Sequence, residues 1–394
     1  MTGDSMLSAP VPIRHRVAAR LSPWLGATLC TASILFVQAA PQASQQASAR
    51  PATPIKTGAT LYKEACAACH GPDGKGQERS LVGFDLALPD FTDCSFATRE
   101  PDADWLAVAH DGGPARGFST VMPAFGEALS KDELSAIVGH VRTFCRDGAW
   151  PRGELNLPRA FFTEKAYPED EAVLTTAFAT TGSAAVSNEI VYEKRFGARN
   201  QIEVKLPIDA AKNDAGAWAG GAGDIVLGFK RAVAHSLRRG SIFAAGGEFQ
   251  FPTGDEAAGL SKNTTVFETF ASFGQVLPRD SFLHAQAGVE LPFDTEKAER
   301  EAFWRVATGK TFTQGMFGRT WTPMVELLAA RELVNGEPVL WDLVPQMQVS
   351  LNTRQHLLLS VGVRTPLNAR SGRQTQVLVY FLWDWFDGGL FSGW

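Results

Sequence analysis

From about residue 171 onward, apolar and polar side chains alternate along the chain with a period of two. The stretch 355–366, for example, has Leu359 and Val361 on one face and Ser360 and Gly362 on the other. This period is that of β-strands, because successive side chains of a strand point to opposite faces. The pattern predicts twelve strands, near 171–181, 188–196, 199–207, 223–233, 240–251, 264–275, 281–292, 301–312, 319–332, 339–351, 355–366 and 373–386.

Alternation alone fits two architectures. In a soluble β-sandwich the apolar faces point inward, whereas in an outer-membrane barrel they point outward to lipid. Many of the predicted strands are long enough for a tilted membrane crossing, and their polar faces mix charges with Gly and Ala, which suits a narrow lumen. We therefore predict an all-β antiparallel outer-membrane barrel of about 12 strands over residues 171–394, with the soluble sandwich as the alternative.

The connections between the predicted strands also tend to alternate in length. Those after strands three, five and seven are long and polar (208–222, 252–263 and 293–300), and those after strands two, six and ten are short (197–198, 276–280 and 352–354). Outer-membrane barrels have long loops outside the cell and short turns on the periplasmic side. With an even number of strands, both ends of the barrel chain are then expected in the periplasm.

Ahead of the strands lies a segment with helical patterning. Ser130 and Glu133 form a capping box, and Leu134 begins an apolar stripe that marks the last helix of this segment. Several Pro and Gly residues follow in the stretch 148–170, which we interpret as a linker between an all-α domain and the strands.

The first residues of the chain have the pattern of a secretory signal. Three arginines, the last at Arg20, precede an apolar stretch at 24–37 that ends in small residues around Ala39. We predict a signal peptide over 1–39, with a transmembrane anchor as the alternative, although the stretch is shorter than the roughly 18 apolar residues of a span. The stretch 40–56 has no periodicity and is expected to be a flexible linker. The mature chain is thus exported to a compartment that permits disulfides.

Composition excludes only a few classes of function. The chain has 394 residues, with 37 Lys and Arg against 42 Asp and Glu and a formal net charge of −5. This balance offers no basic surface, so we expect no nucleic-acid partner. Five cysteines are too few for a disulfide scaffold, and their positions matter more than their number.

Cys66, Cys69 and His70 form the string C-x-x-C-H, which is the attachment signature of c-type haem. Two thiols three residues apart on a helical turn can reach the two vinyl groups of one porphyrin, and the next residue then lies beneath the iron. We predict one haem c, bound covalently by Cys66 and Cys69, with His70 as an axial ligand of the iron. A simple disulfide with an uninvolved His is the alternative.

The residues around this motif, with Tyr62 ahead of it, resemble a class I cytochrome c over about 90 residues. In that family the sixth iron ligand is a Met, usually followed by Pro, and Met122 fits this position. The rival ligands His110 and His140 are expected at the surface or in packing. The resemblance implies His/Met ligation, which fills both axial positions and favours electron transfer over haem catalysis. We therefore predict an electron carrier and no catalytic residues.

Two further cysteines depart from the basic family pattern. Cys94 and Cys145 lie within the same segment, and in an oxidising compartment we expect them to form a disulfide across the domain. Two buried free thiols are the alternative.

The strand-rich half carries weaker resemblances. The stretch 221–230 resembles part of the phenol-degradation-pathway outer-membrane porins, and Trp394 resembles the terminal aromatic of barrel assembly signals. The whole chain is similar in plan to iron-oxidising fused cytochrome-porins, whose haem segment is shorter and whose barrel is larger.

These predictions divide the chain into a signal peptide (1–39), a flexible linker (40–56), a class I cytochrome c domain (57–147), a Pro/Gly-rich linker (148–170) and a barrel (171–394). We expect a haem c electron carrier anchored in outer-membrane lipid, with the haem in the periplasm and periplasmic redox proteins as partners. A small solute that passes through the barrel is a further candidate partner. The alternatives are an outer-membrane channel or transporter with haem as a redox sensor or docking module, and a soluble periplasmic carrier with a sandwich domain.

Overall fold

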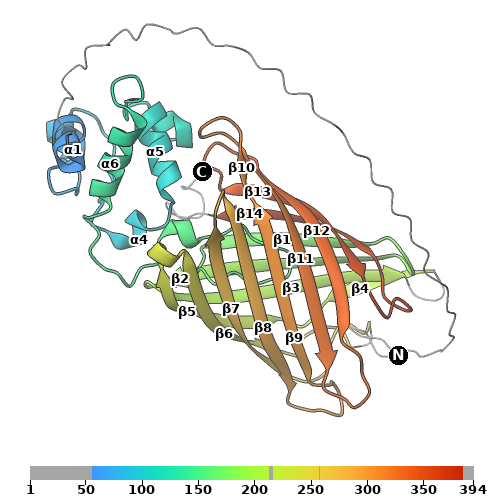
Figure 1. The fold of residues 1–394 in the computed structure, drawn as a ribbon. Coiled ribbons are helices and arrows are strands. Elements are labelled where there is room, and N and C mark those ends of the chain that lie inside the picture. Colours follow the sequence, from blue (N-terminus) through green and yellow to red (C-terminus); the bar gives the residue numbers. More distant parts are fainter. Residues whose placement is uncertain (1–55, 213–215, 257, 385–394) are drawn as a thin grey trace, which may run out of the picture.

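The structure is a computed structural model that describes residues 56–212, 216–256 and 258–384. Within these residues the chain forms a helical domain and a closed β-barrel, and the helices lie beyond one end of the barrel (Figure 1). The predicted signal peptide, the linker 40–55 and Trp394 lie outside the described residues.

The helical domain consists of short elements that pack around one core. Its helices are α1 (Gly58–Ala65), α2 (Ala67–His70), α3 (Arg79–Val82), α4 (Cys94–Ala97), α5 (Asp102–Asp111) and α6 (Lys131–Val141), with a 3-10 turn η1 (Gly113–Arg116). The buried core residues are Leu61, Tyr62, Ala67, Phe91, Leu134, Ile137 and Val141. None of the helices in the described residues is long and apolar enough to cross a membrane.

The crossing of α1 and α6 organises this domain. The predicted capping box begins α6: the Glu133 N–H donates to Ser130 Oγ at 3.3 Å, and the Ser130 N–H donates to the Glu133 carboxylate at 2.9 Å. At the crossing, a Cβ on Gly58 would lie 1.9 Å from the carbonyl oxygen of Ala136. The two helices can therefore approach this closely only because position 58 is a glycine.

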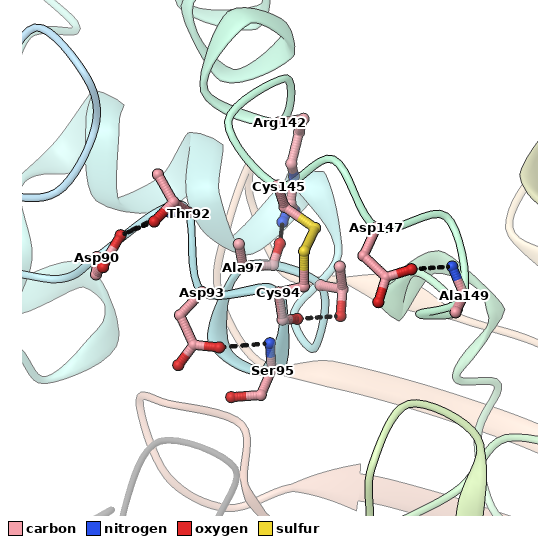
Figure 2. Close-up of a disulfide and its surroundings, with 11 residues drawn as sticks. Asp90, Thr92, Asp93, Cys94, Ser95, Ala97, Arg142, Cys145, Asp147 and Ala149 are labelled. Atoms are coloured by element: carbon pink, nitrogen blue, oxygen red, sulfur yellow. Dashed lines mark hydrogen bonds between the residues drawn. A yellow bond between two sulfur atoms is a disulfide. The ribbon is translucent and has the colours of Figure 1, made fainter.

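A disulfide joins the start of α4 to the chain that follows α6 (Figure 2). The Cα atoms of Cys94 and Cys145 are 5.1 Å apart. Arg142 reinforces the same junction, since its guanidinium donates to the carbonyl oxygens of Ala97 and Glu100, the latter at 2.8 Å. The loop between α4 and α5 is thus tied to the end of α6.

The barrel strands follow in sequence order. They are β1 (Glu171–Ala179), β2 (Ala185–Phe196), β3 (Asn200–Lys212), β4 (Trp218–Ala222), β5 (Val226–Ser236), β6 (Ser241–Gln250), β7 (Val266–Leu277), β8 (Ser281–Pro292), β9 (Glu301–Lys310), β10 (Phe312–Thr313), β11 (Thr320–Glu332), β12 (Leu340–Ser350), β13 (Leu357–Pro366) and β14 (Gln376–Asp384). A short 3-10 turn, η3 (Leu237–Arg239), lies between β5 and β6.

All strand pairs are antiparallel, and the sheet closes on itself because β14 pairs with β1 and β9 pairs with β11. In the described residues the short strand β4 pairs with β3 beside β5, and the short strand β10 pairs with β11 beside β9. Neither adds a separate strand to the wall. Twelve strands therefore form the wall. The prediction of an antiparallel barrel of about 12 strands is confirmed, and the sandwich alternative is wrong because a closed sheet has no second sheet to pack against.

The alternating pattern assigns one face of each strand to the lumen and the other to the outside. On β13, Val361 is 46% exposed and points outward, whereas Ser360 is fully buried and points inward. On β14, Phe381 is 39% exposed and Tyr380 is 1% exposed. The outward face is apolar around the wall, as a barrel in lipid requires.

The two ends of the barrel differ in their connections. One end has the short turns 197–199, 237–240 and 278–280, and the opposite end has the longest connections, from β3 through β4 to β5 and from β6 to β7. The helical domain lies at the short-turn end (Figure 1).

Most of the stretch 148–170, which we expected to be a simple linker, lies inside the barrel. Residues 151–170, which we call the lumenal segment, are all partly or fully buried and run inside the barrel, with a 3-10 turn η2 at Gly153–Leu155. Leu155 and Tyr167 pack against Ala232 and Ile242 of the wall. The segment therefore fills part of the lumen and is not a free linker between the two domains.

We expect Cys94→Ser to lower the free energy of unfolding of the helical domain by about 2–4 kcal/mol, because the bond closes a long loop in the unfolded chain. Thermal unfolding followed through the helical signal measures this. Cys145→Ser serves as the matched variant, since either change removes the same bond. The double variant should be no less stable than the single ones, and an additional loss of similar size would show that the two side chains act separately.

Candidate haem centre and its attachment to the barrel

The C-x-x-C-H residues lie on one continuous helical turn. The Cys66 N–H donates to the Tyr62 carbonyl oxygen at 2.8 Å at the end of α1, and the His70 N–H donates to the Cys66 carbonyl oxygen at 2.9 Å. Cys66 and Cys69 are free thiols, in contrast to the disulfide pair described above. Burial raises the pKa of the Cys66 thiol to about 11, and the neighbouring Cys69 adds to this shift.

His70 ends α2 in a protected position. Its ring stacks on Phe91 with 4.9 Å between centroids, and burial lowers the pKa of the imidazole. Its Nδ1 is buried and has no hydrogen-bond partner among the described residues. A neutral imidazole beside two free thiols is the donor set that a c-type haem needs, so these residues fit that group.

Met122 lies in the loop between η1 and α6. Its carbonyl oxygen accepts from the Gly113 N–H at 3.0 Å, and the loop returns to α5 where the Phe125 N–H donates to the Ala109 carbonyl oxygen at 3.1 Å. Phe125 packs against the same core as Cys66. The fold thus holds the Met122 loop against the core that carries the haem motif.

The two rival histidines have packing partners of their own. His110 Nδ1 lies 2.5 Å from Asp111 Oδ1, and its ring is 5.6 Å from that of Phe317 on the barrel. The His140 ring contacts Tyr62 and Phe144, with centroid distances of 5.3 and 5.1 Å.

The helical domain is fixed to the mouth of the barrel by charged side chains. Arg116 is 6% exposed; its Nε lies 2.5 Å from Asp104 Oδ1, and its Nη1 donates to the Phe317 carbonyl oxygen at 2.8 Å. His356, just before β13, lies between Glu100 of the helical domain at 3.0 Å and Asp384 of β14 at 3.3 Å. These bonds join residues far apart in the sequence, so no local pattern could have revealed them.

The lumenal segment gives a second attachment. The Gly153 N–H donates to the Thr98 carbonyl oxygen at 2.7 Å, and the Asp102 N–H donates to Glu154 Oε1 at 3.0 Å. Arg99 pairs with the buried Asp170. Sequence reasoning missed this role, although one signal was present: the supposed linker contains bulky apolar residues, which a flexible linker lacks. These residues are Leu155, Leu157, Phe161, Phe162 and Tyr167.

Residues 53–141 match the family described as cytochrome C oxidase, cbb3-type, subunit III. The helical domain is therefore a cytochrome c domain, which implies a haem c cofactor. No curated protein sequence matches the chain.

Solved structures are similar to the barrel part. An outer-membrane channel from Pseudomonas putida F1 is 10% identical, with 58% of this chain and 99% of that chain covered and a TM-score of 0.41. The KdgM porin is 9% identical, with 54% of this chain and 98% of its own covered and a TM-score of 0.37. The NanC porin is 8% identical, with coverage of 54% and 98% and a TM-score of 0.40.

On its own geometry, the barrel is of the outer-membrane type, because it is closed, antiparallel and apolar on the outside. The chain thus combines a cytochrome c domain with a porin-like β-barrel.

The burial of Asp104, which pairs with Arg116 near the barrel rim, makes stability depend on pH. Burial raises the pKa of Asp104 to about 6 from its ordinary 3.8, and the charge of Glu100 adds to the shift while Arg116 opposes it. The folded chain binds this proton more tightly than the unfolded chain. The proton bound by Asp104 therefore stabilises the folded chain fully below about pH 4. This stabilisation falls as the pH rises to about 6 and is absent above that value.

We expect Asp104→Asn to remove up to about 3 kcal/mol of this pH dependence, as follows from the pKa shift. Unfolding measured between pH 4 and 7 tests this. Asp85→Asn is the control, because Asp85 pairs with Arg79 at the exposed surface. Equal pH profiles for the wild type and Asp104→Asn would contradict the assignment.

Proposed function

We propose that the protein is an electron carrier whose haem c is bound covalently by Cys66 and Cys69, with His70 and Met122 as axial ligands. The barrel anchors it in the outer membrane, and the haem domain lies in the periplasm. The observation that carries this proposal is the position of two free thiols and a buried imidazole on one helical turn of a domain attached to the mouth of a closed barrel.

The residues around the haem motif are suited to binding rather than to catalysis. When bound, haem c supplies an iron that takes up and releases one electron. His70, whose buried ring is stacked on Phe91, would hold the iron on one side, and Met122, in the loop anchored by Gly113 and Phe125, would hold it on the other. With both axial positions filled, no site is left for oxygen or peroxide, which favours electron transfer.

The sidedness of the proposal comes from the two ends of the barrel. In outer-membrane barrels the short turns face the periplasm and the long loops face outward. The cytochrome c domain contacts the short-turn end through Arg116, which donates to the Phe317 carbonyl oxygen, and through Gly117, whose carbonyl oxygen accepts from Arg354. Periplasmic redox proteins could then reach the domain without crossing the membrane.

We expect one haem per chain that stays attached after denaturation and a low-spin spectrum with a Met-to-iron charge-transfer band in the oxidised state. Met122→Ala should abolish that band because the thioether is its source. Absorption spectra of purified oxidised protein measure it.

His110→Ala and His140→Ala are the matched controls and should keep the band. A band that survives Met122→Ala, or a wild type that lacks the band, would show that Met122 is not the ligand. Haem that is released by denaturation would contradict thioether attachment by Cys66 and Cys69.

A further inference from the structure

The lumen is the part of the molecule that the proposed function leaves unexplained. Its inward side chains are polar and would be wet in an open channel. Many of them are nonetheless almost completely buried, including Glu193, Gln201, Ser272, His284, Glu326, Ser360 and Tyr380, each 1% exposed or less. Five of them bond to the lumenal segment, residues 151–170, namely Glu193, Gln201, His284, Glu326 and Tyr380.

One acceptor on the wall holds the middle of the lumenal segment. The Glu326 carboxylate on β11 accepts from the backbone N–H groups of Phe161, Phe162 and Thr163, at 2.7, 3.1 and 2.8 Å. It also accepts from the Thr163 hydroxyl at 2.8 Å and from Gln346 of β12 at 2.6 Å. Three successive backbone donors in the lumen thus depend on one fully buried carboxylate.

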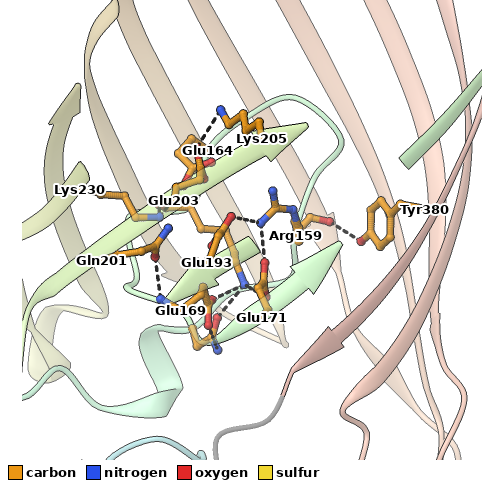
Figure 3. A network of polar contacts seen from close by, with 12 residues as sticks. Arg159, Glu164, Glu169, Glu171, Glu193, Gln201, Glu203, Lys205, Lys230 and Tyr380 are labelled. Carbon is orange, nitrogen blue, oxygen red and sulfur yellow. Dashed lines mark hydrogen bonds and ion pairs between the residues drawn. The ribbon is translucent and has the colours of Figure 1, made fainter. Parts of the chain in front are cut away.

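Ion pairs hold the segment from the opposite wall (Figure 3). Arg159 Nη1 lies 2.5 Å from Glu171 of β1 and 2.7 Å from Glu193 of β2. Lys230 of β5 pairs with Glu164 and donates to the Lys165 carbonyl oxygen at 2.8 Å. Breaking one partner of such a buried pair leaves an uncompensated charge, which makes each pair a strong constraint on position.

Contacts with backbone carbonyl oxygens complete the ring around the segment. Tyr380 of β14 donates to the Arg159 carbonyl oxygen at 2.8 Å, and His284 Nε2 on β8 lies 3.0 Å from the Pro158 carbonyl oxygen. Arg305 of β9 donates to the Phe162 carbonyl oxygen at 2.9 Å. A cavity of about 10 Å³ lies where Glu164 meets β3 and β5, which is room for about one water molecule.

We propose that the lumenal segment is a plug that closes the barrel to ions and small solutes, so that the barrel serves as an anchor and not as a permanently open channel. The proposal rests on the proposed placement of the barrel in a membrane. It does not depend on the haem being active in electron transfer. The plug also joins the barrel to the cytochrome c domain, because Gly153 and Glu154 bond to that domain while Arg159 and Glu164 bond to the wall.

The test is the ion conductance of the purified full-length haem protein in planar lipid bilayers. The wild type should conduct no more than the lipid alone. Replacing residues 155–168 by a Gly/Ser stretch of equal length should give steady open steps. Glu326→Ala should give intermittent ones, because it leaves three plug N–H groups without their acceptor. Glu290→Gln is the matched control, since Glu290 pairs with Lys262, and it should stay closed.

If the variant with the replaced segment does not form a barrel, it will lack the heat-dependent gel mobility of a folded barrel. A second measurement then tests the plug without that variant. Ser360→Cys, at a fully buried lumenal position, should resist a small charged thiol reagent in the otherwise wild-type chain. It should become reactive when combined with Glu326→Ala. Ala184→Cys, at an exposed position between β1 and β2, is the reactive control.

Steady conductance of the wild type, or rapid labelling of Ser360→Cys, would overturn the plug. A folded replacement variant that stays closed would do the same. A conducting wild type with a normal haem spectrum would leave the electron-transfer proposal intact. A closed wild type without covalent haem would refute the electron-transfer proposal and leave the plug.

Discussion

The structure depends on the hydrogen bonds and ion pairs between the polar side chains that line the lumen and the lumenal segment that passes through it. A chain inside a narrow barrel has no bulk water to satisfy its N–H and C=O groups, so the wall must supply the partners. Glu326 supplies acceptors for three successive N–H groups, and Arg305 and Tyr380 donate to carbonyl oxygens of the same segment. In return, Arg159 and Lys165 of the segment supply positive charge to buried carboxylates of the wall: Arg159 pairs with Glu171 and Glu193, and Lys165 also pairs with Glu171.

The same constraint determines where the cytochrome c domain lies. The lumenal segment leaves the barrel at the short-turn end, and its first residues bond to Thr98 and Asp102. Arg116 and His356 then add bonds between the domain and the rim. Because the segment is held on both sides, the domain is attached by a rigid connection and not by a flexible tether. A redox partner would therefore meet the haem domain in one orientation relative to the membrane.

Most of the wall and the haem motif could be predicted from the sequence, because both are local patterns. The alternation of Ser360 and Val361 gives the inward and outward faces of β13 directly, and the spacing of Cys66 and Cys69 carries the haem chemistry. The lumenal segment could not be predicted in the same way. Its Pro and Gly residues indicate a loop, and several of its partners lie more than 100 positions away, such as Glu326, which is bound to Thr163, and Arg305, which is bound to Phe162. Only closure of the barrel brings them together.

We propose that the haem exchanges electrons with soluble proteins on the periplasmic side only. The most direct test adds a reduced blue-copper protein to sealed, right-side-out outer-membrane vesicles that contain the wild-type chain, and follows the haem spectrum before and after the vesicles are opened. Such a reductant is too large to pass a porin. The account predicts that the haem stays oxidised in sealed vesicles and is reduced once they are opened. Reduction in sealed vesicles would contradict the sidedness, and no reduction after opening would contradict electron transfer.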